Sequence, residues 1–231
     1  MVSSSIGHLV SGAFWLGSIL AAWYLMPESG LAAGGRGLHI IAHRGNGNGA
    51  PENSVAALRR AGDHADTVEL DVQLSSDGVP VVIHDSTVDR TTHRIGRVDA
   101  LTAGELRALA IPTLSETLSA LEDRTNVLVD LKHVAPGKAI QLVEACVRDI
   151  DRAGVRARCS FQTIHPENLV ALEQRAAGVP YSLLAGTAGD IQLAVALAFA
   201  VRASGLNTTL NGLDQGSVIM AHALGMKVYV Y

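Results

Sequence analysis

Aromatic and charged residues are both scarce in this chain. Of its 231 residues, 4% are Phe, Trp or Tyr and 17% are charged, with a formal net charge of −4. The sequence has no run of basic residues and no interleaving of basic with aromatic residues. This composition predicts that the protein has no nucleic-acid partner.

Cysteine is equally scarce. The two cysteines, Cys146 and Cys159, lack the spacing of zinc ligands and imply no disulfide framework. We expect two small buried side chains, and a single bridge stays open if the domain is exported. Apolar residues make up 48% of the chain, which is enough for a sizeable core in one large domain or two small ones.

The N-terminal part contains one long apolar segment. Residues 6–26 form an almost uninterrupted apolar run, and a helix of this length measures about 31 Å, enough to cross a bilayer. A signal peptide and an uncleaved anchor are both open, and residues 30–32 would suit a cleavage site. The absence of Lys and Arg from residues 1–5 favours an anchor. We therefore expect an anchor or signal segment with a Gly/Ala-rich linker over 1–37, followed by a folded domain over 38–231.

Short apolar segments alternate with helical patterns from residue 38 onward. This order favours a parallel sheet buried on both faces, and eight strands predict a (β/α)₈ barrel of the α/β class. The predicted strands are 38–42, 67–72, 79–84, 126–131, 157–161, 181–185, 205–208 and 226–231. The predicted helices are 54–62, 114–121, 138–153, 166–176, 190–203 and 215–224.

Three features depart from the ideal repeat. Residues 75–78 are too few for the crossover that parallel strands need. The polar region at about 86–111 predicts an inserted loop or cap. The chain ends inside its eighth predicted strand, so we expect a barrel that is incomplete at the C-terminus and lacks its last helix.

A histidine and an arginine follow the first predicted strand. His43 and Arg44 precede a loop rich in Gly and Asn, and Asn53 or Ser54 is placed to cap the next helix. His84 ends the third predicted strand in the same way. Two histidines at strand ends, where barrel active sites lie, suit acid–base cleavage of a phosphodiester.

Acidic residues lie two apart on two of the predicted strands. Glu69 and Asp71 share one face of a strand, as do Asp130 and Lys132. Carboxylates inside a barrel need a positive partner, and a hard divalent cation is the natural one. Lys132 would bind phosphate. The alternatives are the polar face of a surface strand and a plain Asp–Lys pair at a strand end.

An ordered series of motifs is similar to that of the glycerophosphodiester phosphodiesterase family, over about residues 38–231. The matching segments are 43–45 (HRG), 51–54 (PENS), 68–72 (VELDV), 77–85 (DGVPVVIHD), 89–92 (DRTT), 111–114 (IPTL), 130–132 (DLK) and 160–161 (SF).

The resemblance implies a barrel enzyme that hydrolyses glycerophosphodiesters to an alcohol and glycerol 3-phosphate with a divalent cation, either Mg²⁺ or Ca²⁺. Asp130 stands where the family usually has Glu, which makes that ligand one methylene shorter. The implied roles are acid–base catalysis for His43 and His84, phosphate binding for Arg44 and Lys132, metal binding for Glu69, Asp71 and Asp130, and support for Glu52.

Two other functions stay open at this stage. A phospholipase D-like lyase would act on a lysophospholipid or sphingomyelin, and the apolar N-terminal segment would bring such lipids within reach. A catalytically inactive, truncated barrel would serve as a binding module. For the enzyme we expect a membrane-anchored or exported protein whose catalytic domain lies outside the cytoplasm.

Overall fold

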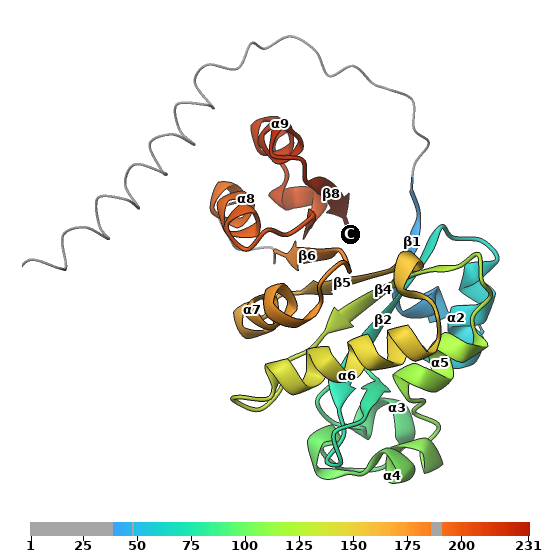
Figure 1. Ribbon diagram of the computed structural model, residues 1–231. Coiled ribbons are helices and arrows are strands. Elements are labelled where there is room, and N and C mark those ends of the chain that lie inside the picture. Colours follow the sequence, from blue (N-terminus) through green and yellow to red (C-terminus); the bar gives the residue numbers. More distant parts are fainter. Residues whose placement is uncertain (1–38, 48, 186–190) are drawn as a thin grey trace, which may run out of the picture. The chain divides into compact units, whose positions relative to one another are not determined.

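The computed structural model describes residues 39–47, 49–185 and 191–231 (Figure 1). The predicted apolar helix over 6–26, and with it the segment 1–37, lies outside these residues. Among the helices within them, none has both the length and the apolar character needed to cross a membrane.

A curved, mostly parallel sheet forms the centre of the described part (Figure 1). The strand order along it is β1-β2-β4-β5-β6-β7-β8. Because these neighbours are parallel, the chain returns to the other end of the sheet between each strand and the next. The strands are β1 (Ile41–Ala42), β2 (Thr67–Leu74), β4 (Asn126–Leu131), β5 (Cys159–Thr163), β6 (Tyr181–Leu184), β7 (Gly205–Thr208) and β8 (Lys227–Val230). No pairing joins β1 to β8 among the described residues, which leaves an open part of a barrel.

The third predicted strand differs from the prediction. Residues 79–84 were counted among the eight strands of the predicted barrel, although the short link at 75–78 marked a departure from its repeat. In the structure, β3 (Pro80–Val82) pairs antiparallel with the end of β2. Only a tight turn joins the two strands, and a parallel arrangement would need a crossover of a dozen or more residues. The described sheet therefore has seven parallel strands and one antiparallel branch in place of eight parallel strands.

Helices cover the outer face of the sheet (Figure 1), and all six predicted helices are present within three residues of their predicted ends. Local signals start several of them: the Ser54 hydroxyl accepts from the Ala57 N–H, and Thr113 forms a capping box with Glu116. The helices are α2 (Val55–Gly62), α5 (Leu114–Ala120), α6 (Ala139–Arg152), α7 (Pro166–Arg175), α8 (Ile191–Ala200) and α9 (Gln215–Ala223).

The region after β3 forms a small unit with its own buried cluster. It contains α3 (Asp89–Thr92), a 3₁₀ turn η2 (Val98–Ala100) and α4 (Ala103–Ala108). Val98 and Leu106 pack there against Val81 and Ile83 from the β3 segment. This unit thereby stands beside the C-terminal end of β2.

Alternation along the strands separates an apolar face from a polar one. Val68, Leu70 and Val72 of β2 belong to the main hydrophobic cluster, whereas Glu69 and Asp71, which alternate with them, are buried polar residues. The same division recurs on β4 and β5. The free, buried Cys146 and Cys159 belong to the apolar cluster, as predicted. The concave side of the sheet thus collects the polar groups.

Candidate active site

A tight turn after β1 places the segment that begins with His43 and Arg44 against β2. His43–Gly47 forms a 3₁₀ turn, and the backbone N–H of Arg44 donates to Glu69 Oε2 over 2.8 Å. Gly45 has a φ of +73°, and a Cβ there would lie 2.7 Å from the backbone carbon of Ala57. Only glycine fits this position without displacing α2.

Three carboxylates meet on the concave side of the sheet. Asp71 of β2 is directly opposite Asp130 of β4 in the register, and Glu69 is two residues earlier on β2. One oxygen from each lies within 4.8 Å of the others, and all three residues are buried. The predicted juxtaposition is therefore present in the structure.

The electrostatics of this cluster favour a bound cation. Burial, followed by the charge of Asp71, raises the pKa of Glu69 to about 8, and burial also raises the pKa of Asp130. Glu69 Oε1 is buried and has no hydrogen-bond partner among the described residues. An orphaned oxygen within an all-oxygen donor set fits a hard divalent cation.

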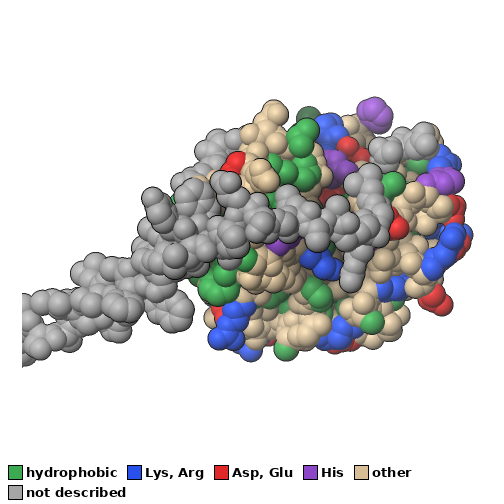
Figure 2. Space-filling model, turned by 90° about the horizontal axis from the view of Figure 1, so that it is seen from above, with side chains coloured by type: hydrophobic (Ala, Val, Ile, Leu, Met, Phe, Trp, Pro, Cys, Tyr) green, Lys and Arg blue, Asp and Glu red, His purple; other side chains and the backbone are tan. Residues whose placement is uncertain are grey.

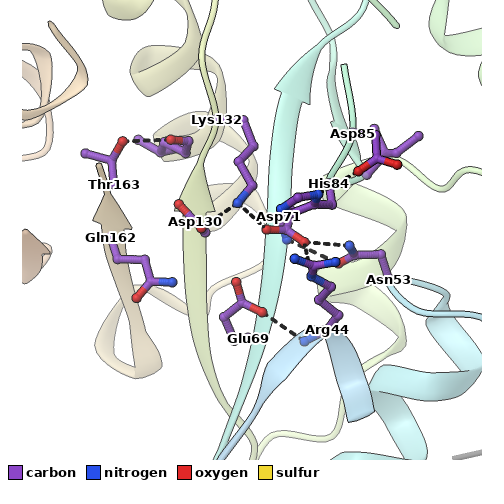
Figure 3. Close-up of polar contacts among 12 residues, drawn as sticks. Arg44, Asn53, Glu69, Asp71, His84, Asp85, Asp130, Lys132, Gln162 and Thr163 are labelled. Atoms are coloured by element: carbon purple, nitrogen blue, oxygen red, sulfur yellow. Dashed lines mark hydrogen bonds and ion pairs between the residues drawn. The ribbon is translucent and has the colours of Figure 1, made fainter. Parts of the chain in front are cut away.

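Lys132 lies between two of the carboxylates (Figure 3). Its Nζ is 2.6 Å from Asp71 Oδ1 and 2.7 Å from Asp130 Oδ2. Burial lowers the pKa of Lys132, but the charges of Asp130 and Asp71 outweigh this effect and the net pKa is raised. The two carboxylates therefore favour the charged form of Lys132.

Asn53 holds Asp71 in place, a role that we did not predict. Its amide donates to Asp71 Oδ2 over 2.7 Å, and its own oxygen accepts from the Asp71 N–H over 3.2 Å (Figure 3). Asn53 has a φ of +58°, a conformation that Asn tolerates better than most residues. Of the two predicted caps for α2, Ser54 caps the helix and Asn53 supports the site.

A chain of polar contacts connects His84 to Arg44. His84 Nδ1 lies 2.7 Å from Asp85 Oδ1, and Arg90 links Asp85 to Glu52 through contacts of 2.5 Å on each side. Arg44 Nη1 donates in turn to Glu52 Oε1 over 3.2 Å. Hydrogen bonding to Arg90 lowers the pKa of Asp85 to about 2. Glu52 thus contacts both Arg44 and Arg90, and its supporting role stays a prediction, whereas the contacts of Asp85 and Arg90 were not predicted.

His43 lies within electrostatic range of the same groups. Its side chain keeps an exposed surface, and partial burial, then the charge of Arg44, lowers the pKa of His43. Asp71, Lys132 and His84 also affect this pKa. All eight predicted site residues are therefore gathered around one end of β2 and β4.

A cavity of about 660 Å³ opens beside this cluster and would admit a small phosphodiester. Its lining combines sheet residues with residues of the unit that follows β3, including Gln73, His84, Arg97, Lys132, His133 and His165. The Gln73 amide donates to the carbonyls of Ile83, His84 and Asp85, which fixes the backbone that carries His84. On the face in Figure 2, acidic and basic side chains are interspersed.

The profile of the glycerophosphoryl diester phosphodiesterase family matches residues 43–231. The chain belongs to this family. The matched range includes the two histidines, Arg44, Lys132 and the three carboxylates of the site described above.

Relatives and solved structures agree with this membership of the glycerophosphoryl diester phosphodiesterase family. Human glycerophosphodiester phosphodiesterase 1 is 41% identical over 112 residues, which are 41% of this chain and 34% of that protein. The glycerophosphodiester phosphodiesterase of Caldanaerobacter subterraneus is 40% identical over 124 residues, 46% of this chain and 51% of that protein. These matches thus span between a third and a half of the curated relatives.

Solved structures of the family share the fold. A phosphodiesterase from Oleispira antarctica, solved with its product sn-glycerol 3-phosphate, superposes with a TM-score of 0.75 at 25% identity over 84% of each chain. The Thermotoga maritima glycerophosphodiester phosphodiesterase gives a TM-score of 0.70 at 24% identity, over 85% of this chain and 87% of that one. The fold is accordingly TIM-barrel-like.

Proposed function

We propose that this chain hydrolyses glycerophosphodiesters to an alcohol and sn-glycerol 3-phosphate with the help of a divalent cation. The observation that carries the proposal is the meeting of three buried carboxylates with Lys132 and Arg44 on the concave side of the sheet. A site with this balance of charge suits a phosphodiester, whose single negative charge needs positive groups on more than one side.

The phosphate would be held by charges that are already in position. Lys132 Nζ and the Arg44 guanidinium both face Asp71, at 2.6 Å and 3.2 Å, so neither has to be ordered when substrate binds. Glu69, Asp71 and Asp130 would hold a divalent cation, Mg²⁺ or Ca²⁺, which offsets charge on the phosphoryl oxygens.

The histidines would transfer the protons. One takes a proton from the attacking water as the new P–O bond forms, and the other gives a proton to the alcohol oxygen as the old P–O bond breaks. Asp85 orients the His84 ring through Nδ1, which directs Nε2 to the reaction. Partial burial, then the charge of Arg44, lowers the pKa of His43, which favours the neutral ring that a proton acceptor needs.

The decisive assay is release of sn-glycerol 3-phosphate from glycerophosphocholine by the whole chain, with Mg²⁺, with Ca²⁺ and with chelator. We expect metal-dependent release, and a loss of at least about 100-fold in His43→Ala and in His84→Ala. His222→Ala, an exposed histidine on α9, is the matched control. An active double variant would overturn the proposal, and a cyclic phosphate product would indicate the lyase.

For location, we propose an anchored or exported protein whose catalytic domain lies outside the cytoplasm. The support is the apolar run over 6–26 in the sequence. Expressed with residues 1–37, the chain should sediment with membranes and resist extraction by carbonate, and without them it should not. Equal fractionation of the two forms would contradict an anchor.

A further inference from the structure

A second group of metal-binding side chains lies outside the proposed mechanism. His133 follows β4, and His165 and Glu167 lie at the start of α7. One ligand atom from each lies within 4.8 Å of the others, a property that the described residues show for just one other group, the three buried carboxylates. None of the three side chains takes part in the proposed reaction.

The distances suit a small metal ion. His133 Nδ1 lies 3.1 Å from Glu167 Oε1, and the ring centroids of His133 and His165 are 5.4 Å apart with the planes tilted by 54°. In a tetrahedral zinc site with ligands at about 2.0–2.1 Å, neighbouring ligand atoms are about 3.3 Å apart. The ligand atom of His165 lies within 4.8 Å of those of His133 and Glu167, so a metal would have to draw the three atoms closer together.

A common hydrogen-bond network holds the backbone of both histidines. The buried Asn168 amide donates to the carbonyls of Leu131 and Lys132, immediately before His133. It also donates to Thr163 Oγ1, which accepts from the N–H of His165. The two ligand-bearing segments are therefore fixed relative to each other before any metal binds.

The donor atoms define the class of metal. Two imidazoles and one carboxylate suit zinc and related transition ions, whereas Mg²⁺ and Ca²⁺ prefer oxygen donors such as those of Glu69, Asp71 and Asp130. We propose that His133, His165 and Glu167 form a second metal site, selective for a zinc-class divalent cation. His133 and His165 line the same cavity as Lys132, so the cation would lie in the cavity wall.

The coordination would be incomplete, as in zinc sites that bind an exchangeable ligand. Three protein ligands leave a fourth tetrahedral position for water or for an anion in the cavity. The competing explanation is a hydrogen-bonded His133–Glu167 pair at the surface, since both side chains are exposed. That explanation predicts no metal binding that depends on His165, which has no hydrogen bond to either residue among those described.

The test is a titration of the tag-free whole chain with Co²⁺, followed by competition with Zn²⁺, in saturating Mg²⁺ at pH 7.5. We expect one equivalent of Co²⁺ with the intense visible absorption of a tetrahedral ion, displaced by Zn²⁺. His133→Ala and His165→Ala should each weaken binding by at least about tenfold, because removal of even an outer-shell partner costs this much.

Two controls separate this site from the other one and from the surface. His222→Ala and Glu69→Gln should retain the cobalt spectrum, the first because α9 carries no ligand and the second because it alters the oxygen site alone. Circular dichroism checks that each variant is folded. Three results would overturn the proposal: no Co²⁺ spectrum in the folded wild-type chain, an unchanged spectrum in His133→Ala/His165→Ala, or its loss in Glu69→Gln alone.

Discussion

Asp71 is shared by three partners at the centre of the site. Arg44, Lys132 and Asn53 approach its two oxygens at 3.2, 2.6 and 2.7 Å. Asp71 is fully buried, so its charge is tolerated through these partners and through any bound cation. A residue that fixes Asp71 should therefore matter for stability as well as for activity.

The role of Asn53 can be separated into its side chain and its backbone. Asn53→Gly keeps the positive φ but removes both hydrogen bonds to Asp71, and we expect a loss of about 1–3 kcal/mol in the free energy of unfolding. Asn53→Ala should lose more, because Ala also disfavours that φ. Urea denaturation measures both variants.

Asn126→Ala is the control for these variants, because it removes an exposed amide that donates to a backbone carbonyl. It should change stability by no more than about 0.5 kcal/mol. Both Asn53 variants should also lose phosphodiesterase activity. Wild-type activity in Asn53→Gly would show that Asp71 needs no such support.

Glu69 predicts an unusual dependence of stability on pH. Its pKa is raised by burial from 4.5 to about 8, so between these values the folded chain retains a proton that the unfolded chain releases. Without a divalent cation, stability should therefore fall as pH rises through this window, by at most about 1.4 kcal/mol per pH unit from this group.

Glu69→Gln isolates this contribution. The variant keeps the shape of the side chain and cannot titrate, so the unfolding free energy of the wild type minus that of the variant should fall from pH 5 to pH 8. Urea denaturation in chelator at several pH values gives the difference. Parallel curves for the two proteins would mean that Glu69 titrates normally in the folded chain.

At the scale of the element, the turn after β1 depends on one glycine. Gly45→Ala adds a Cβ 2.7 Å from the backbone of Ala57 at a φ of +73°, whereas Gly137→Ala meets no atom within 4 Å at a φ of +80°. Both variants have the cost of the positive φ, about 1 kcal/mol. Gly45→Ala should lose clearly more stability, and also activity, because the turn places Arg44 against Glu69.

The pair is compared by thermal unfolding and by glycerol 3-phosphate release. Gly137→Ala should keep its activity, because Gly137 itself is not among the described residues that line the cavity. Equal losses of stability and activity in the two variants would show that α2 can shift to accept the added Cβ without disturbing the site.

The strands show which parts of the site could be predicted from the sequence and which could not. A period of two placed Glu69 and Asp71 on one face, and the strand assignment of 126–131 brought Asp130 beside them. The apolar pattern of β3 left its direction open, because an apolar run looks the same in either direction. The length of the turn at 75–78 indicates the direction, because four residues can join two antiparallel strands but not two parallel ones.

At the scale of the molecule, the contacts that sequence reasoning missed join distant segments. Asn53 reaches Asp71 across 18 residues, and Arg90 reaches Glu52 across 38. No periodicity encodes such pairs, since the fold alone brings the segments together. The chemistry at strand ends was predictable because strand ends share one side of a parallel sheet.

The carboxylate cluster also predicts how a cation should affect the whole fold. The three carboxylates come from β2 and β4, which are adjacent in the sheet but separated along the chain by the unit that follows β3. A cation held by all three would therefore bind the folded chain and not the unfolded one. At 100 times its dissociation constant, such a ligand adds about 2.7 kcal/mol to the free energy of unfolding.

Thermal unfolding of the chelator-treated chain at pH 8, with and without Mg²⁺ or Ca²⁺, measures this gain. We expect a higher melting temperature with cation in the wild type and little or no shift in Asp130→Asn. His165→Ala should keep the full shift, because its imidazole belongs to the proposed zinc-class site and Mg²⁺ and Ca²⁺ prefer oxygen. A shift that survives in Asp130→Asn but disappears in His165→Ala would reverse the assignment of the two sites.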